Sequence, residues 1–308
     1  MLHRSSRLAA ALAGALALTL GLSGCVVLRE GGTEPAQSAG AQQAYTEVVP
    51  LPESVKERGY LVFGSQLASP PMNFPADKGY QGINVDVVEE IGSLLGVEIR
   101  WKQLPFAGLI PAVKSKQIDA GIDLIGDTQE RAQVVDFSNY MNQATSPLVQ
   151  RGNPHGIESA ADLCGLPIAI VRGGVQLELA EDENDKCLQE GKKPIEINQF
   201  SAPGDARLSV QAGRTAAFLG NTPVMRYIAE NKATSKVFEM GGEATYQRQP
   251  IGIITAKGRR DLKQSIQSAL DVMQAEGTVD ELLAKWEIQD LALDAPQDEA
   301  NEETGAGQ

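Results

Sequence analysis

Short apolar runs and amphipathic segments alternate along most of this chain, in two successive series. Residues 60–64 and 97–103 are typical of buried strands, and residues 84–95 repeat apolar side chains at helical spacing. The first series is strand 60–64, helix 84–95, strand 97–103, helix 106–114 and strand 119–123. The second series is strand 167–171, helix 175–183, strand 195–200, helix 204–212, strand 215–220 and helix 223–231. Strands separated by helices form parallel sheets with right-handed crossovers, so the sequence predicts an α/β fold.

One segment of the first series has a counterpart in the second. Residues 112–120 and residues 209–217 both contain the end of a helix, a turn with a basic residue and the start of a strand. This internal similarity predicts two lobes of one architecture. Because ligands of open α/β sheets bind at the carboxyl ends of strands, two such lobes facing each other would enclose a binding cleft.

The N-terminus has the features of an export signal. Basic residues precede an apolar run of about 15 residues, which is too short for a comfortable membrane span. The run ends in Leu22-Ser23-Gly24-Cys25, which resembles a bacterial lipobox. We therefore expect a signal peptide over residues 1–24, a lipid on Cys25 and a flexible linker over residues 25–52. An ordinary signal peptide that contains a cysteine is the alternative. At the other end, an acidic disordered tail is expected over residues 291–308.

The acidic composition argues against several classes of function. Without residues 1–24 the chain keeps 25 basic and 40 acidic residues, a formal charge of −15. A nucleic-acid-binding protein needs a basic face, and this balance argues against one. Removal of the signal also leaves a single histidine, His155, which cannot build a multi-histidine zinc site. We expect no metal, no cofactor and no histidine-based hydrolase.

Two cysteines, Cys164 and Cys187, remain besides Cys25. An even pair in an exported chain predicts a disulfide bond. Two buried free thiols are the alternative. The polar residues before Cys187 indicate a surface position for it, whereas Cys164 has both polar and apolar neighbours.

Several short motifs follow one another in a fixed order. They are Gly82-Ile83-Asn84-Val85-Asp86-Val87-Val88, Leu109-Ile110-Pro111-Ala112-Val113, Gln117-Ile118-Asp119-Ala120, Asp127-Thr128-Gln129-Glu130-Arg131, Val135-Asp136-Phe137-Ser138, Ala275-Glu276-Gly277-Thr278 and Lys285-Trp286. Their order and spacing resemble the bacterial extracellular solute-binding proteins of family 3, the polar-amino-acid receptors of ABC importers. The resemblance extends from about Val55 to Trp286.

This resemblance implies a two-lobed clamshell of the periplasmic-binding-protein type II class, with two parallel-rich sheets and a two-strand hinge. Lobe 1 would comprise residues 53–146 and 250–290, and lobe 2 residues 147–249. The hinge would lie near residues 142–149 and 248–253. The implied partners are a small ligand, an amino acid or related carboxylate, and an ABC permease in the membrane. The protein would be a monomer, held by its lipid on the extracytoplasmic face of the cell membrane.

A carboxylate site is predicted around Arg131. Thr128 is a suitable helix N-cap, and Arg131 lies one turn into that helix, where a guanidinium fork and backbone N–H groups can hold a carboxylate. The resemblance assigns the α-carboxylate of the ligand to Arg131, with Gly126 and Thr128 beside it. A surface arginine that pairs with Glu130 or Asp127 is the alternative.

A second contribution to this site is predicted from the other lobe. Gly173, Gly174 and Val175 stand between a strand and a helix, and their backbone N–H groups could hold the other carboxylate oxygen. The family usually has Ser or Thr at the positions of Gly174 and Val175, so hydroxyl donors are missing here. A tight turn that simply requires glycine is the alternative.

The predicted amino-group site departs from the family pattern. The resemblance places an Asp at the position of Asn221, and an Asn offers one carbonyl acceptor without charge. Asp123, at the end of a predicted strand, could supply the missing charge. A strand-end carboxylate that faces water is the alternative for Asp123.

The aromatic wall of the site also departs from the pattern. Ser69 stands where family members often carry an aromatic residue that stacks on the ligand. Phe106 matches a second family aromatic and is expected to form one apolar wall. Phe74 is interpreted as a core residue. A site of this composition need not prefer a standard amino acid.

The C-terminal part of the family match is interpreted as structural. Residues 271–286 are expected to form first-lobe helices, with a capping box at Thr278-Val279-Asp280-Glu281. Trp286 is expected in the core.

Three functions remain open from the sequence. The first is capture and presentation of a solute, which needs no chemistry. The second is an enzyme that resembles cyclohexadienyl dehydratases, with Asp123 or Asp127 as its acid. The third is a ligand sensor that acts through a separate signalling partner.

Overall fold

A computed structural model of the chain describes residues 46–242 and 245–293. The predicted signal peptide, the lipidation site Cys25 and most of the predicted linker and acidic tail lie outside the described residues. Within the described part, no helix combines the length and the apolar composition needed to cross a bilayer.

Three parallel strands form the first half of the main sheet. β1 (Tyr60–Ser65) pairs with β4 (Glu98–Gln103) on one side and with β5 (Ala120–Gly121) on the other. α2 (Ile83–Leu95) connects β1 with β4 and ends at Gly96, whose φ of 65° forms a left-handed cap, as predicted. The remaining elements of this part are α1 (Glu53–Arg58), the hairpin of β2 (Phe74–Pro75) and β3 (Tyr80–Gln81), η1 (Phe106–Gly108), α3 (Leu109–Lys114) and α4 (Gln129–Ala132).

The second half repeats this scheme. β7 (Pro167–Val171) pairs in parallel with β8 (Glu196–Phe200) and with β9 (Ala217–Asn221). The helices of this half are η2 (Ala160–Leu163), α5 (Gln176–Gln189), α6 (Pro203–Gln211) and α7 (Thr222–Glu230). The predicted strand over 167–171 is confirmed at both ends, whereas α5 continues beyond its predicted end at residue 183.

Two long antiparallel strands join the halves. They are β6 (Val135–Gln150) and β11 (Tyr246–Ala256), and the short β10 (Phe238–Met240) pairs with β6. β11 also pairs with β5, and β6 with β9, which gives the strand order β4-β1-β5-β11-β6-β9-β7-β8. The expectation of two separate sheets is therefore met only in part. The parallel strands form two groups, but the joining strands hydrogen-bond to both and make one continuous sheet.

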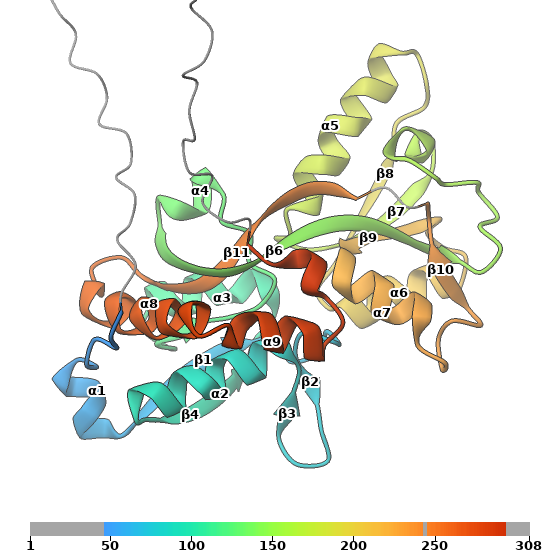
Figure 1. Cartoon of the computed structure of the whole chain (residues 1–308). Helices are drawn as coiled ribbons and strands as arrows, with labels where there is room; N and C mark the ends of the chain where they lie inside the picture. The colour runs from blue at the N-terminus through green and yellow to red at the C-terminus, as the bar shows by residue number, and fades with distance from the viewer. Residues whose placement is uncertain (1–45, 243–244, 294–308) are drawn as a thin grey trace, which may run out of the picture. The chain divides into compact units, whose positions relative to one another are not determined.

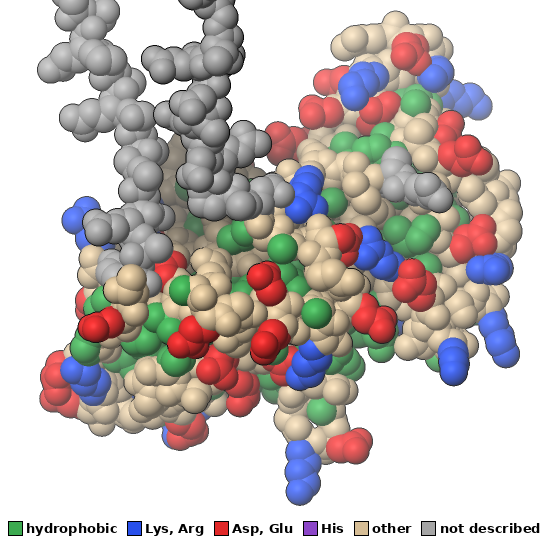
Figure 2. All heavy atoms as spheres, in the orientation of Figure 1, with side chains coloured by type: hydrophobic (Ala, Val, Ile, Leu, Met, Phe, Trp, Pro, Cys, Tyr) green, Lys and Arg blue, Asp and Glu red, His purple; other side chains and the backbone are tan. Residues whose placement is uncertain are grey.

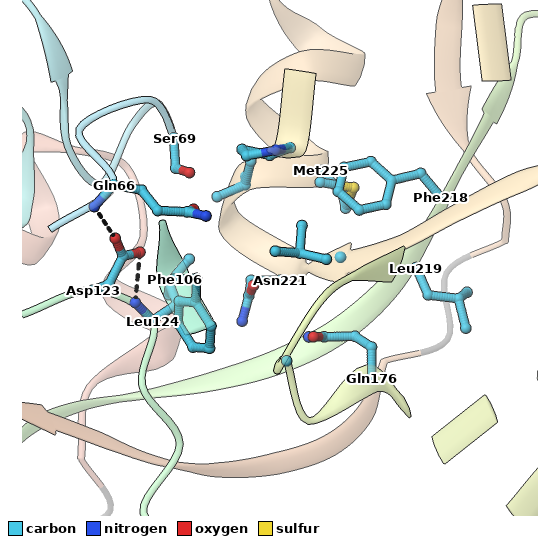
Figure 3. A pocket seen from close by; sticks show the side chains of 15 residues that line it. Gln66, Ser69, Phe106, Asp123, Leu124, Gln176, Phe218, Leu219, Asn221 and Met225 are labelled. Carbon is cyan, nitrogen blue, oxygen red and sulfur yellow. Dashed lines mark hydrogen bonds between the residues drawn. The ribbon is translucent and has the colours of Figure 1, made fainter. Parts of the chain in front are cut away.

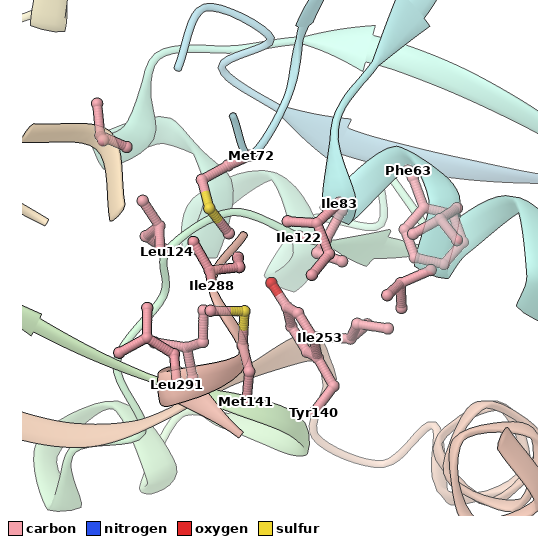
Figure 4. Packing of buried hydrophobic residues seen from close by; sticks show 14 of the residues in the cluster. Phe63, Met72, Ile83, Ile122, Leu124, Tyr140, Met141, Ile253, Ile288 and Leu291 are labelled. Atoms are coloured by element: carbon pink, nitrogen blue, oxygen red, sulfur yellow. The ribbon is translucent and has the colours of Figure 1, made fainter. Parts of the chain in front are cut away.

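Helices cover both faces of this sheet (Figure 1). In the first half, apolar residues of α2, α8 (Arg260–Ala275) and α9 (Thr278–Lys285) pack with β1, while α3 contributes to a separate apolar cluster. In the second half, α6 and α7 belong to the main core, and α5 packs in a cluster of its own with β7. Figure 4 shows part of the main core around the fully buried Tyr140, whose hydroxyl donates to Asn84 Oδ1.

Trp286, predicted in the core, is partly buried and packs against the main core, and the start of α9 differs from the prediction. Trp286 donates from Nε1 to Asp86 Oδ2 at 2.6 Å and meets Phe74 edge-on, with ring centroids 5.9 Å apart. The predicted capping box is wrong. α9 begins at Thr278 itself, and its N-cap is Gly277, which has no side chain to accept a hydrogen bond.

The predicted disulfide is present. Cys164 and Cys187 are bonded, with their Cα atoms 5.6 Å apart, and the bond ties the end of η2 to α5. The expectation that Cys187 lies at the surface is wrong. Its side chain is fully buried, because it is on the face of α5 that packs against β7.

The surface is rich in acidic side chains. Figure 2 shows Asp and Glu side chains spread over the face formed by α8 and α9. Exposed acids on or beside these helices include Glu276, Asp280 and Glu281. This face carries the acidic character that the composition indicates.

Candidate functional site

A hollow lies at the carboxyl ends of the parallel strands, and both halves of the sheet line it (Figure 3). The first half contributes Gln66 and Ser69 after β1 and Asp123 after β5. The second half contributes Gln176 at the start of α5 and Asn221 at the end of β9. The position of this hollow is the usual one for ligands of open α/β sheets.

The structure brings together about half of the residues predicted for ligand binding. The predicted residues that line the hollow are Ser69, Phe106, Asp123, Gly174 and Asn221. The predicted residues outside its lining are Gly126, Thr128, Arg131 and Val175. Arg131 lines an adjoining hollow, and Phe106 lines both.

Arg131 reaches from the first half of the protein to the second. Its Nη1 donates to the Gly126 carbonyl at 3.1 Å, and its Nη2 donates to the Gly173 carbonyl at 2.8 Å. The guanidinium carbon lies 5.8 Å from the centre of the Phe106 ring. Burial lowers the pKa of Arg131, and the nearby carboxylates of Glu130 and Glu178 oppose that shift. Because arginine is not deprotonated in proteins, the guanidinium is a cation between the halves.

Thr128 is confirmed as the N-cap of α4. Its Oγ1 accepts the backbone N–H of Arg131 at 3.3 Å, so the hydroxyl fixes the start of the short helix that carries Arg131. Its predicted role toward a ligand stays a prediction.

Gly126 lies where the two halves approach each other closely. A Cβ at this position would lie 2.7 Å from Gln249 Oε1 and 3.2 Å from Val175 Cγ1. A larger residue would have to displace the Gln249 side chain and would crowd Val175. Gly126 and Val175 therefore meet across the halves, beside the carbonyl that Arg131 contacts.

In the turn of Gly173 and Gly174, the Gly174 N–H is hydrogen-bonded within the turn itself. Gly173 has a φ of 79°, which favours glycine, and the Gly174 N–H donates to the Val171 carbonyl at 3.1 Å. The Gly174 N–H, expected to hold a ligand oxygen, is thus occupied within the turn in this conformation. The alternative interpretation, a tight turn that requires glycine, therefore accounts for the geometry.

Asp123 is a buried acceptor for the ends of two strands. Its Oδ2 accepts from Ser65 Oγ and from the Gln66 N–H, each at 2.9 Å, and its Oδ1 accepts from the Leu124 N–H at 2.9 Å. Burial raises the pKa of Asp123, although these hydrogen bonds act in the opposite direction. With 2% of its surface exposed, Asp123 does not face water, so that alternative is wrong.

Asn221 is oriented by a glutamine of β6. Its Nδ2 donates to Gln143 Oε1 at 2.6 Å, which leaves its Oδ1 as an acceptor on the side of the hollow (Figure 3). Gln143 is fully buried, and its Nε2 has no hydrogen-bond partner among the described residues.

Sequence reasoning missed the amides that surround this position. Gln66 and Gln176 line the hollow, and Gln176 is held by a hydrogen bond of 3.2 Å from its Nε2 to Thr145 Oγ1 of β6. Gln66 directly follows β1, and Gln176 follows the glycine turn after β7. The rule that sites form at the carboxyl ends of strands was the signal that could have identified both.

The two acids named for the enzyme alternative, Asp123 and Asp127, already accept hydrogen bonds from the chain. Asp127, named for the enzyme alternative, lines neither hollow, and its Oδ2 accepts from Asn139 Nδ2 at 2.8 Å. The lining can therefore hydrogen-bond neutral polar groups through its amides, and Arg131 in the adjoining hollow can bind an anion.

Known proteins of similar sequence are binding proteins. The L-cystine-binding protein TcyJ of Escherichia coli (strain K12) is 29% identical over 240 residues, which are 77% of this chain and 85% of the relative. The arginine-binding protein ArgT of Corynebacterium glutamicum is 26% identical over 297 residues, which are 94% of each chain.

Solved structures show the same fold. The crystal structure of a mutant of ArgBP from T. maritima matches with a TM-score of 0.67 at 27% identity, over 76% of this chain and 97% of that chain. The fold is the mixed α/β fold of the type II periplasmic binding proteins.

A family model extends over most of the described residues. The model of the bacterial extracellular solute-binding proteins, family 3, matches residues 61–289, from β1 to η3. This span contains both halves of the sheet and every residue that lines the hollow. The chain belongs to the bacterial extracellular solute-binding proteins, family 3.

Proposed function

We propose that this protein captures an amino acid outside the cytoplasm and delivers it to an ABC importer. The observation that carries this proposal is the hollow lined by strand ends of both halves, with Arg131 reaching between them. The names of the relatives, which bind cystine or arginine, support the class of ligand.

Arg131 would bind the α-carboxylate of the ligand. In this conformation its two terminal nitrogens donate to two carbonyl oxygens, those of Gly126 and Gly173. A carboxylate can replace the Gly173 oxygen and accept from the same fork, with charge added to the hydrogen bond. Phe106, whose ring lies under the guanidinium and lines both hollows, would then contact the ligand.

The α-ammonium group would face Asn221. Its Nδ2 is bound to Gln143, and its Oδ1 would accept from the ligand. Asp123 lines the same hollow, but three of its acceptor positions are filled by Ser65, Gln66 and Leu124. Asp123 would therefore act through the strand ends that it positions.

The two halves would act as lobes that close on the ligand. Lobe 1 would comprise residues 53–146 and 250–290, and lobe 2 residues 147–249. β6 and β11 pass between them, and the pairing of these strands shifts register between Tyr246 and Gln249 and between Ile251 and Gly252. Irregular pairing at these places supports a hinge, because fewer ladder hydrogen bonds resist bending there.

Membrane attachment would come from the N-terminus. A lipid on Cys25 and a linker over residues 25–52 would hold the monomeric binding protein near its permease on the extracytoplasmic face. Replacing Cys25 with Ser should release the protein from the membrane fraction of the producing cells, and a membrane-bound C25S variant would contradict the anchor.

The enzyme alternative finds no support. The named relatives are binding proteins, and the acids proposed for catalysis, Asp123 and Asp127, accept hydrogen bonds from the chain itself. The protein works by capture and presentation. A sensor role would need the same ligand site and a different membrane partner, which co-purification would identify.

Calorimetric titration of the mature chain with a panel of amino acids tests the proposal. Two charge-assisted hydrogen bonds contribute roughly 1.5–3 kcal/mol each, so Arg131→Ala is expected to weaken binding at least 100-fold. Arg131→Lys keeps the charge without the fork and should recover only part of the loss. The control is Arg214→Ala, at an exposed turn before β9. Equal affinity of Arg131→Ala and the wild type would refute the assignment.

A further inference from the structure

The hollow is poor in charge for a site that binds a zwitterion. Of the fifteen residues that line it, Asp123 is the only one with an ionisable side chain. Its carboxylate is buried and already accepts from Ser65, Gln66 and Leu124. The hollow therefore presents no free carboxylate and no cation to a ligand side chain.

Apart from Asp123, the charged side chains considered near the hollow lie outside its lining. Arg131 lines the adjoining hollow, and the carboxylates that act on it belong to Glu130 and Glu178. Both of these glutamates are exposed. In the proposed binding mode, moreover, Arg131 is engaged by the α-carboxylate. A charged side chain that enters the hollow would thus lose its hydration without gaining an ion pair.

Neutral polar groups take the place of charges. Gln66, Gln176 and Asn221 line the hollow with amides, which offer both donors and acceptors. Beneath Asn221, the fully buried Gln143 has an Nε2 without a partner among the described residues. Gln143 lies outside the lining, and its amide adds a neutral group, not a charge, next to Asn221.

The rest of the lining is apolar. Phe106 approaches from the first half, and Phe218 and Met225 from the second (Figure 3). Val224 of α7 also lines the hollow. Apolar walls favour the methylene groups of a side chain and make an unpaired charge between them more costly.

We infer that this site selects amino acids with uncharged side chains and rejects cationic and anionic ones. The inference rests on the proposed function and adds the chemical class of the ligand. It separates this chain from the arginine-binding relative ArgT, whose ligand is a cation.

Gln176 is the residue that we assign to this selection. It is 3% exposed, and the hydrogen bond from its Nε2 to Thr145 Oγ1 holds the amide in place. A glutamate at this position would have the same shape and could accept from the Thr145 hydroxyl instead. The variant Gln176→Glu therefore places a negative charge in the hollow with little change in packing.

Matched ligand pairs test the selection on the wild-type mature chain. The pairs are citrulline and arginine, glutamine and glutamate, and norleucine and lysine, which differ mainly in charge. The neutral member of each pair is expected to bind at least tenfold more tightly in calorimetric titration. Arginine or lysine binding as tightly as its neutral partner, and depending on Arg131, would overturn the inference and leave the proposed function intact. No binding by any of the six would overturn both.

The variant gives a second readout. Gln176→Glu is expected to shift the citrulline-to-arginine affinity ratio at least tenfold toward arginine. The control is Gln189→Glu, at the exposed far end of the same helix, which should leave the ratio unchanged. A ratio that does not move in Gln176→Glu, with the same unfolding midpoint as the control, would contradict the assignment of Gln176.

Discussion

The two halves of this protein have the same order of strands and helices but stabilise their site segments differently. In the first half, the Asp123 carboxylate ties the end of β1 to the segment after β5 through Ser65, Gln66 and Leu124. In the second half, a disulfide between Cys164 and Cys187 ties η2 to α5, the helix that begins at Gln176. A buried acid therefore connects the segments of the first half, and a covalent bond connects those of the second.

This difference indicates how each half will respond to its surroundings. A buried carboxylate without a cation partner makes stability depend on pH, because its protonation changes with folding. A disulfide acts mainly on the unfolded chain and makes stability depend on redox conditions. The first half should thus be the pH-sensitive one, and the second half the reductant-sensitive one.

Removal of the disulfide should have the largest effect on stability. The bond closes a loop with a sequence separation of 23 residues, for which the loss is about 3 kcal/mol in the chain-entropy model. We expect the double variant Cys164→Ala, Cys187→Ala to unfold at a correspondingly lower urea concentration. Dithiothreitol should lower the wild-type midpoint to the same value and leave the variant unchanged. If dithiothreitol leaves the wild-type urea midpoint unchanged, the disulfide does not stabilise the second half and the prediction is wrong.

Replacement of Asp123 should have the next largest effect. Asp123→Asn keeps the shape but points an amide donor at one of three existing donors, at a cost of about 2 kcal/mol. Urea unfolding at neutral pH measures this loss. The control is Asp205→Asn, which removes the same charge at an exposed position of α6.

The stability difference between the wild type and Asp123→Asn should also depend on pH. Burial raises the pKa of Asp123 above its ordinary value of 3.8, so the native state binds a proton more readily than the unfolded state. Wild-type stability relative to Asp123→Asn should therefore increase as pH falls from above the raised pKa toward 3.8. A carboxylate stabilised in its charged form would give the opposite slope. Finding that slope would mean that the hydrogen bonds to the carboxylate outweigh the effect of burial.

The fold was largely predictable because local patterns determine it. The strand over 167–171 and the helix that ends at Gly96 follow from short apolar runs and a glycine cap. The length of β6 and β11 was not predictable in the same way. Their pairing depends on residues more than 100 positions apart in sequence, and no local pattern encodes it. The capping box failed because Gly277 ends the preceding turn with a positive φ and moves the helix start to Thr278.

The site was predictable where it follows from topology. Asp123 and Asn221 meet at one hollow because each lies at the carboxyl end of a strand. Gln143 was missed because a glutamine inside a long strand has no distinctive pattern, and it gains its role from contact with Asn221 of a distant strand. The adjoining position of Arg131 depends on its hydrogen bond to the Gly173 carbonyl of the other half, which sequence spacing does not give.

A negative charge introduced at Asn221 should change the contribution of the second half to ligand affinity. Asn221→Asp gives the second half a carboxylate of its own, and the buried Nε2 of Gln143 can turn to donate to it. We expect affinity for an α-amino acid to rise about tenfold, or roughly 1.4 kcal/mol, because the ammonium gains a charged acceptor. Titration with the best ligand of the panel measures this. The control is Asn198→Asp on β8, and weaker binding by Asn221→Asp would show that the ammonium lies elsewhere.

The smallest expected effect concerns a contact that connects the two halves. Arg226 of α7 forms a two-pronged ion pair with Asp290 of η3, with distances of 3.1 and 3.0 Å. The side chains are 32% and 52% exposed, so the pair contributes less than about 1 kcal/mol and weakens with salt. Arg226→Ala should reduce ligand affinity at most fivefold at low salt and not at all at high salt. Lys232→Ala, just beyond the same helix, removes a positive charge without this pair and is the control. A larger loss that persists in high salt would mean that the halves are coupled through this contact and not only through the ligand.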